Sequence, residues 1–284
     1  MEPCCHQGLT PPCTEALIKA GLKKVVVGMV DPDPRVSGKG ISRLKDSGLE
    51  VIEGVLNQEC EGINREFIFR VRNGRPWGIL KWAMSLDGRI GLQNGSSKWI
   101  TNSPARDSVH QIRSKCDAVI VGGGTVRADN PLLTSRGKST LEPLRVVFSK
   151  SLDLPKSAKL WDTKIAKTLI AYGPEGDESF FSNLQDGPEK LRLNSNDPSE
   201  LLKSLANKRC NKILWECGPL LATSAIKANC VQQLVVFVAP KLLGGKSAMS
   251  PLNSFGFESI SSTYKLQHSF LERKGEDLCW SLLI

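Results

Sequence analysis

Between residues 77 and 240 the sequence repeatedly alternates short apolar runs with longer amphipathic segments. The apolar runs are rich in β-branched residues and predict strands at 79–84, 118–121, 145–148, 168–171, 213–215 and 234–238. Helices are expected near 103–113, 199–206 and 220–228. Because strands that alternate with helices form parallel sheets, we expect an α/β domain with a mostly parallel sheet.

The first 74 residues show a shorter version of the same alternation. We expect a helix through Ala16 and Ala20, a strand at 25–27, a second helix at 41–45 and a second strand at 49–52. A charged connecting helix is expected over 57–71, and the turn-forming residues of 72–76 predict a domain boundary. The predicted domains are therefore 1–74 and 75–284. Only the polar stretch 182–199 is expected to be a mobile loop.

Charge and cysteine usage limit the class of ligand and the compartment. The 38 basic and 29 acidic residues give a net charge of +9, which favours anionic ligands. Nucleic acid is not expected, because the basic residues form no tract and two tyrosines offer little surface for stacking bases. No apolar run predicts a membrane span or signal peptide, and nine scattered cysteines suggest reduced thiols, so we expect a soluble cytoplasmic protein.

The N-terminal segment 2–13 reads Glu-Pro-Cys-Cys-His-Gln-Gly-Leu-Thr-Pro-Pro-Cys, and it matches only part of a zinc site. Zinc deaminases carry His-x-Glu before their Pro-Cys and second Cys. Neither His110 nor His268 is followed two positions later by Glu. The thiolates of Cys4 and Cys13 alone make a poor zinc site, since hydrolytic zinc needs three protein ligands and a carboxylate. Residual metal binding and ordinary thiols both remain open.

With eight residues between Cys4 and Cys13, this motif resembles the second half of the zinc motif in the bifunctional deaminase/reductase family of riboflavin biosynthesis. The resemblance implies that both cysteines are zinc ligands, and that the His ligand and the catalytic Glu precede Met1. Residues 1–74 would then be the C-terminal half of a zinc deaminase domain, a partial cytidine-deaminase-like α/β/α remnant. The resemblance continues through 75–284, which implies a reductase domain with a dihydrofolate-reductase-like fold.

The first block of this resemblance covers 80–89 and 95–101. An ammonium on a strand, here Lys81, can stabilise charge that develops on the group being reduced. The alternative is a surface lysine that extends its charge into water. The resemblance implies that Ser97 contacts the substrate, and that Ala83 and Trp99 contact the cofactor, although a lone tryptophan is more often a core residue.

The second block runs from 113 to 136 and contains three consecutive glycines at 122–124. Glycines after a buried strand let the backbone approach a ligand, although a simple tight turn is the alternative. Guanidinium groups suit a ribose phosphate, and a solvated charge is again the alternative. The resemblance implies these contacts: Thr125 and Asp129 with the cofactor, and Arg113, Leu133 and Arg136 with the substrate.

The third block covers 213–224, where an apolar strand ends in Glu216 and Gly-Pro opens a helix. This order places a carboxylate and free backbone N–H groups at the carboxyl end of the sheet, where α/β proteins bind ligands. Glu216 could otherwise interact with the helix dipole. The resemblance implies that Glu216 binds substrate and that one turn binds the cofactor phosphate: Gly218, Pro219, Leu220, Leu221, Ala222, Thr223 and Ser224.

The expected activity is NADPH-dependent reduction of 5-amino-6-(5-phosphoribosylamino)uracil to its ribityl form, as the resemblance implies. Lys81 and Glu216 are expected to position and polarise the reacting group, with Asp129 near the cofactor. The alternatives are zinc-dependent deamination of the diaminopyrimidine precursor, with zinc bound only if the site is completed, and a non-catalytic docking or oligomerisation role for 1–74. We expect a homo-oligomer that acts on a small phosphorylated pyrimidine, with neither nucleic acid nor membrane as partner.

Overall fold

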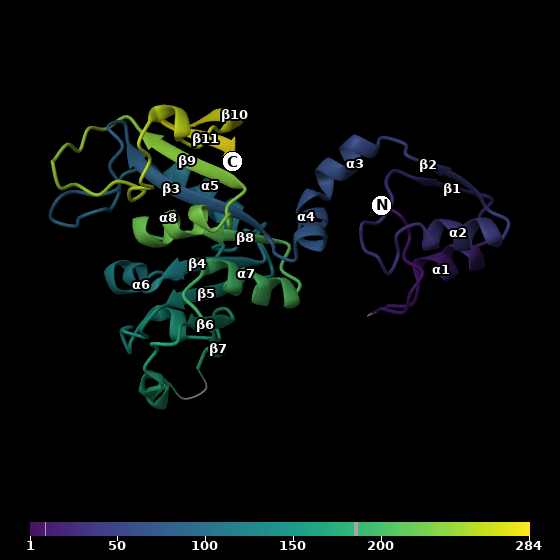
Figure 1. The fold of residues 1–284 in the computed structure, drawn as a ribbon, viewed down its shortest axis with the longest axis horizontal. Helices are drawn as coiled ribbons and strands as arrows, with labels where there is room; N and C mark the ends of the chain where they lie inside the picture. The colour runs from purple at the N-terminus through teal and green to yellow at the C-terminus, as the bar shows by residue number, and fades with distance from the viewer. Residues whose placement is uncertain (9, 185–186) are drawn as a thin grey trace. The chain divides into compact units, whose positions relative to one another are not determined.

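The structure is a computed structural model that describes residues 1–8, 10–184 and 187–284 (Figure 1). The chain divides into two compact units, Met1–Gly74 and Arg75–Ile284. Within the described ranges, no helix is both long enough and apolar enough to cross a bilayer.

The first unit contains a two-stranded parallel sheet with helices before, between and after its strands. Strands β1 and β2 pair from Lys24 opposite Glu50 to Val27 opposite Glu53. The two expected strands and the two helices expected before residue 50 are present, close to their predicted ends. The elements are α1 (Cys13–Lys19), β1 (Lys24–Val27), α2 (Lys39–Asp46), β2 (Glu50–Glu53), α3 (Asn57–Ile63) and α4 (Arg65–Asn73).

The prediction of one connecting helix over 57–71 is wrong, because this segment forms the two helices α3 and α4. The break falls at Asn64, whose φ of −101° and ψ of 11° lie outside the helical region. The side-chain amide of Asn64 donates to the carbonyl oxygen of Cys60 at 2.8 Å. A side chain that bonds to the backbone of the preceding turn competes with continuation of the helix.

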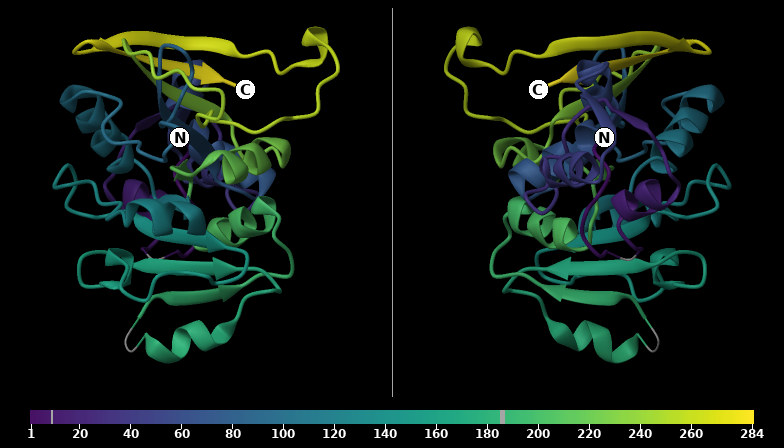
Figure 2. Two further views of the ribbon diagram at one scale, coloured as in Figure 1. Left: turned by 90° about the vertical axis from the view of Figure 1, so that its left-hand side faces the viewer. Right: turned by 90° about the vertical axis from the view of Figure 1, so that its right-hand side faces the viewer.

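The second unit is built on one nine-stranded sheet with the order β10-β11-β9-β3-β8-β4-β5-β6-β7. Pairing is parallel from β9 to β7, and antiparallel where β11 meets β9 and β10. The mostly parallel α/β sheet is therefore confirmed. In both views of Figure 2 the yellow β10–β11 hairpin lies at one end of this sheet, and β7 lies at the other.

The helices of this unit cover both faces of the sheet. Buried residues of α7 and α8 belong to one hydrophobic cluster, and those of α5 and α6 belong to a second cluster. The strands are β3 (Trp77–Ser85), β4 (Ala118–Gly122), β5 (Leu144–Ser149), β6 (Thr168–Tyr172), β7 (Glu189–Arg192), β8 (Lys212–Trp215), β9 (Gln233–Ala239), β10 (Gln267–Lys274) and β11 (Asp277–Leu283). The helices are α5 (Ser103–Arg113), α6 (Gly123–Asp129), α7 (Pro198–Asn207) and α8 (Pro219–Lys227), with 3₁₀ turns at Lys159–Trp161, Glu178–Asn183 and Ile260–Ser262.

The expectation of a loop over 182–199 is wrong at both ends, which belong to helical turns, and at 189–192; residues 184, 187–188 and 193–197 are in neither helix nor strand, and residues 185–186 lie outside the described ranges. Residues 189–192 form β7, which pairs in parallel with β6 from Leu169 opposite Glu189 onward. Strand β7 has the sequence Glu-Lys-Leu-Arg, so hydrogen bonding to a neighbouring edge, rather than apolar patterning, defines it. The hairpin strands β10 and β11 were likewise not expected, because polar residues interrupt both of them.

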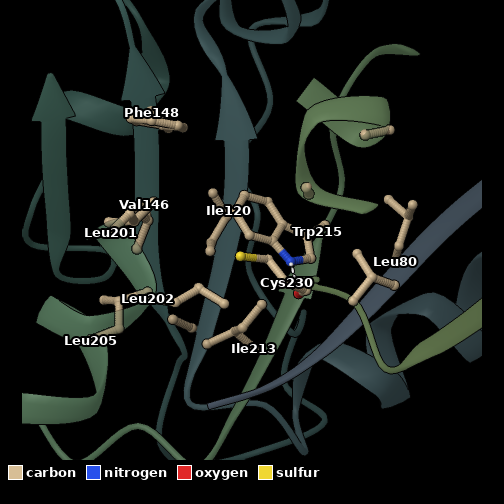
Figure 3. Close-up of a cluster of buried hydrophobic side chains, with 14 of the residues drawn as sticks. Leu80, Ile120, Val146, Phe148, Leu201, Leu202, Leu205, Ile213, Trp215 and Cys230 are labelled. Carbon is tan, nitrogen blue, oxygen red and sulfur yellow. Dashed lines mark hydrogen bonds between the residues drawn. The ribbon is translucent and has the colours of Figure 1, made fainter. Parts of the chain in front are cut away.

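Burial on both faces explains why the central strands read as continuous apolar runs. Trp215 on β8 is fully buried, and its indole N–H donates to the carbonyl oxygen of Cys230 at 3.1 Å (Figure 3). Gly78 on β3 lies directly against the backbone of Cys230, because a Cβ atom added to Gly78 would come within 2.0 Å of the Cys230 carbonyl oxygen. This close packing fixes β3 beside β8, so that the last residue of β8 lies opposite Leu80 in the middle of β3.

Candidate active site

The parallel pairing of β3 and β8 brings Lys81 and Glu216 together, where β8 ends beside the middle of β3. Leu80 on β3 lies opposite Trp215, the last residue of β8, so Lys81 and Glu216 follow at adjacent positions of the register. The backbone N–H of Glu216 donates to the carbonyl oxygen of Ile120 on β4 at 2.9 Å. Backbone hydrogen bonds of β8 with its neighbours β3 and β4 therefore fix the position of Glu216.

The Glu216 carboxylate binds two cations that lie far away in the sequence. Its Oε2 lies 2.9 Å from the Nζ of Lys81. Arg113, the last residue of α5, donates from Nε to Oε1 at 2.5 Å and from Nη2 to Oε2 at 3.0 Å. The exposed fractions of these side chains are 17% for Lys81, 13% for Arg113 and 8% for Glu216. We call Lys81, Arg113 and Glu216 the charged triad.

The protonation state of Glu216 follows from these contacts. Burial alone would raise its pKa, but the charges and hydrogen bonds of Arg113 and Lys81 together lower the pKa well below the ordinary carboxyl value. Glu216 is therefore ionised at neutral pH and serves as a hydrogen-bond acceptor, not as an acid. The adjacent Cys217 does not offer a nucleophile, because burial raises the pKa of its thiol to about 12.

Arg113 and Arg136 differ in what their guanidinium groups contact. In addition to its two hydrogen bonds to Glu216, Arg113 donates from Nη1 to the carbonyl oxygen of Thr134 at 3.0 Å. Three of its five N–H groups are therefore used. Arg136 is exposed, and its guanidinium has no hydrogen bond or ion pair with any residue that the structure describes. Arg136 is thus the freer of the two cations.

The turn before Arg136 is well anchored. The backbone N–H and the hydroxyl of Ser135 donate to the two carboxylate oxygens of Glu142, at 2.5 and 2.9 Å. Leu133 in the same segment is buried and, like Arg136, adopts a positive φ. This anchoring holds the predicted substrate contacts Leu133 and Arg136 on one short segment.

The two segments that are predicted to hold the cofactor lie beside each other. A Cβ atom at Gly122, at the end of β4, would lie 3.3 Å from the side chain of Leu221 in the first turns of α8. Gly218 precedes α8 at the N-cap position, and no side chain in the described part of the chain caps the helix. A Cβ atom at Gly218 would meet no atom of the described residues within 4 Å, so the helix N-terminus is accessible to a ligand.

Other predicted residues of the cofactor turn have structural contacts of their own. The hydroxyl of Thr223 accepts a hydrogen bond from the backbone N–H of Asn253 at 2.8 Å. Leu220 is exposed, whereas Ala222 is buried. The remaining members, Pro219 and Ser224, belong to the body of α8.

Asp129 contacts Lys98, the residue that directly precedes Trp99 in the sequence. The Nζ of Lys98 lies 3.0 Å from Asp129 Oδ1, at the end of α6. Trp99 is 63% exposed, and the guanidinium of Arg106 lies 4.7 Å from its ring centre, so Trp99 is not a core residue. Among the described residues, Asp129 makes no ion pair with the charged triad. Ser97 and Ala83 are both half-buried, and Thr125 lies in the first turns of α6.

In the Met1–Gly74 unit, a buried carboxylate positions Cys4. Glu2 accepts hydrogen bonds from the backbone N–H groups of Asp31, Gly38, Gly40 and Ile41, at 2.8–3.1 Å. This anchors the start of the motif at the N-terminus of α2. The backbone N–H of Cys13 then donates to the Sγ of Cys4 at 3.3 Å, so the two thiols are neighbours.

These two thiols do not make a zinc site by themselves. Within residues 1–8, 10–184 and 187–284, no group of three or more His, Cys, Asp or Glu side chains could hold a metal ion. A zinc ion needs at least three protein ligands. The residues present therefore do not fit zinc, and we derive no reaction step through it.

Three comparisons with known proteins agree on one family. Residues 76–280 match the model of the RibD C-terminal domain. The riboflavin biosynthesis protein RibD of Synechocystis sp. is 48% identical over 278 residues, which cover 98% of this chain and 76% of that protein.

Two solved structures are similar over nearly the whole chain. Acinetobacter baumannii RibD, form 1, superposes with a TM-score of 0.88 at 33% identity, over 99% of this chain and 78% of that chain. A diaminohydroxyphosphoribosylaminopyrimidine deaminase/5-amino-6-(5-phosphoribosylamino)uracil reductase from Thermotoga maritima gives a TM-score of 0.85 at 31% identity. That likeness covers 99% of this chain and 77% of the other.

Proposed function

The chain belongs to the RibD family of riboflavin-biosynthesis proteins, and we propose that it catalyses the NADPH-dependent reduction of 5-amino-6-(5-phosphoribosylamino)uracil to 5-amino-6-(5-phosphoribitylamino)uracil. The reaction belongs to the Arg75–Ile284 unit, which has the dihydrofolate-reductase-like α/β fold of its relatives. One observation carries the proposal: the charged triad lies where β8 ends beside the middle of β3, inside the segment 76–280 that matches the family.

The charged triad can orient a pyrimidine and polarise the group that is reduced. When bound, the nicotinamide cofactor supplies a hydride for C1′ of the opened sugar. Glu216 holds Lys81 in a fixed place, and the ammonium keeps donors beyond the one that contacts Glu216. Those donors stabilise negative charge that develops on the oxygen or nitrogen attached to C1′. The ionised Glu216, whose contacts with Arg113 and Lys81 leave one acceptor position unused, accepts a hydrogen bond there from a pyrimidine N–H group.

The assay for this proposal uses the full chain with the phosphoribosylamino substrate and NADPH. We expect substrate-dependent loss of reduced nicotinamide, and a product that mass spectrometry shows to be two hydrogens heavier. A parallel reaction with NADH measures the preference for the phosphorylated cofactor. If no NADPH is oxidised and neither ligand binds, the proposal is wrong.

The N-terminus of α8 is the proposed site for a cofactor phosphate, and Gly218→Ala tests it. Gly218 has a φ of −72°, and its added methyl would touch no protein atom, so the folded structure should be unaffected. The same methyl would occupy space that a phosphate needs to approach the N–H groups. We expect the KM for NADPH to rise by about 10-fold or more, with little change in kcat.

Gly62→Ala is the matched control for this variant. A Cβ atom at Gly62 in α3 also meets no atom within 4 Å, and alanine favours a helix interior. The control should therefore keep the wild-type KM and melt no lower than the wild type. An unchanged KM for NADPH in Gly218→Ala would place the cofactor phosphate elsewhere.

Deamination is not part of the proposal, because Cys4 and Cys13 find no third ligand in the described parts of the chain. We propose the cytoplasm as the compartment, since all nine cysteines are free thiols and a net charge of +9 suits phosphorylated small molecules. We also propose a homo-oligomer. Exposed Phe270, Leu271 and Trp280 on the outer hairpin of the sheet support this association.

A further inference from the structure

His110 is a half-buried histidine on α5 that no part of the proposed mechanism uses. Its Nδ1 atom is buried and has no hydrogen-bond partner among the residues that the structure describes. It lies three residues before Arg113, and residues with this spacing share one face of a helix. The side of α5 that delivers Arg113 to the charged triad therefore also delivers an imidazole with unused hydrogen-bonding capacity.

The charges around His110 come from three different segments. Burial lowers its pKa, Arg113 and Arg136 lower it further, and Glu216 and Asp107 act in the opposite direction without reversing the result. Both acids already have cationic partners, because Glu216 contacts Arg113 and Lys81, and Asp107 contacts Lys138 at 2.7 Å. The imidazole is therefore neutral at neutral pH and lies in a region of excess positive charge.

An anion is the partner that this region lacks. Arg136 has no partner among the described side chains, and Arg113 retains two unused N–H groups. A phosphate monoester carries close to two negative charges at neutral pH and three acceptor oxygens, which suits guanidinium groups and an imidazolium together. Leu133 and Arg136 lie on the segment that is predicted to contact the substrate, not on the α8 turn that is proposed for the cofactor.

We propose that His110, together with Arg136 and the free side of Arg113, forms the subsite that holds the ribose phosphate of the substrate. This inference rests on the proposed function and adds a residue to its binding site. A bound phosphate dianion reverses the local excess of positive charge, which favours the imidazolium form. Substrate binding is then accompanied by uptake of one proton at His110.

The chain has three histidines, so the titration of His110 can be followed directly by nuclear magnetic resonance of the imidazole C–H signals in the full-length protein. His110→Gln identifies the signal by its loss. We expect the free protein to show a pKa for His110 below the ordinary value of 6.5. Saturating ribose 5-phosphate should raise that pKa, because the phosphate charge favours the imidazolium, whereas ribose should leave it unchanged.

Two further ligands separate the substrate phosphate from the cofactor phosphate. NADP⁺ and NAD⁺ differ by the 2′-phosphate, and we expect them to have the same effect on the His110 titration. If NADP⁺ shifts the titration and ribose 5-phosphate does not, the anion belongs to the cofactor and the inference is wrong. If ribose 5-phosphate binds without moving the His110 signal, the inference is also wrong.

Kinetics give a second measurement that does not depend on the signal assignment. His110→Gln should raise the KM for the phosphorylated substrate by about 10-fold near pH 6.5, with kcat within about twofold of the wild type. His6→Gln, in the other unit, is the control and should keep the wild-type KM. If the KM is unchanged in His110→Gln but the wild type oxidises NADPH, the phosphate subsite is wrong and the proposed function stands. If the wild type does not oxidise NADPH, the proposed function itself is wrong.

Discussion

Replacing Glu216 with glutamine is expected to lower kcat/KM of the reductase by about 100-fold or more, because the carboxylate fixes the position of Lys81. Glutamine has almost the same shape but carries no charge. Lys81 and Arg113 would then be two buried cations without a counter-ion. Their repulsion displaces the ammonium from the place where the reacting group needs it. Steady-state kinetics over a range of substrate concentrations measure this loss.

The same substitution should also destabilise the protein. Removing one partner of a buried ion pair costs about 3–5 kcal/mol of unfolding free energy. The pKa of Glu216 is lowered in the folded state, so its contribution is present above the ordinary carboxyl value of 4.5 and is lost as the pH falls below it. The difference in unfolding free energy between wild type and Glu216→Gln should therefore have its largest value at pH 7 and become progressively smaller below pH 4.5.

Glu175→Gln is the matched control for this prediction. Glu175 also forms an ion pair with a lysine, since its Oε1 lies 3.3 Å from the Nζ of Lys150, but both side chains are exposed. Water screens such a pair, so its loss should change neither activity nor melting temperature measurably. If Glu216→Gln behaves like Glu175→Gln, the charged triad is not the centre of the site.

The fold of the second unit could be predicted largely from its sequence, because strands that are buried on both faces leave a clear apolar signal. The runs at 118–121 and 168–171 appear as β4 and β6 almost to the residue. Strand β7 and the β10–β11 hairpin lack that signal, since they lie at the sheet edges and face water in part. Their pairing depends on the backbone groups of neighbouring strands, which the side-chain pattern of the segment itself does not reveal.

The candidate site was less predictable, because its contacts join residues that are distant in the sequence. The motifs identify Arg113 and Glu216 separately, but the bidentate contact across 103 positions depends on how α5 packs against one face of the sheet. The motif also suggests that Arg113 binds phosphate, whereas the structure shows Glu216 as its main partner. For His110 the sequence offers one signal, the spacing of three residues from Arg113, and this spacing has meaning only within a helix.

Lys81→Met is expected to separate catalysis from stability within the charged triad. Without the ammonium, charge that develops on the reacting group has no donor, so kcat/KM should fall by about 100-fold. Stability should be unchanged or slightly higher, because Glu216 keeps its bidentate contact with Arg113 and methionine fills the volume of the lysine stem. Kinetics and thermal unfolding of the same samples test both statements.

The double variant Lys81→Met/Glu216→Gln sharpens this test. It leaves Arg113 as a single buried cation, so it should be more stable than Glu216→Gln, although equally inactive. Lys150→Met, which removes an exposed lysine from a surface pair, should resemble the wild type in both measurements. A Lys81→Met protein that stays active, or that melts as low as Glu216→Gln, would show that Lys81 only supports the fold, and the reductase chemistry would then need another cation.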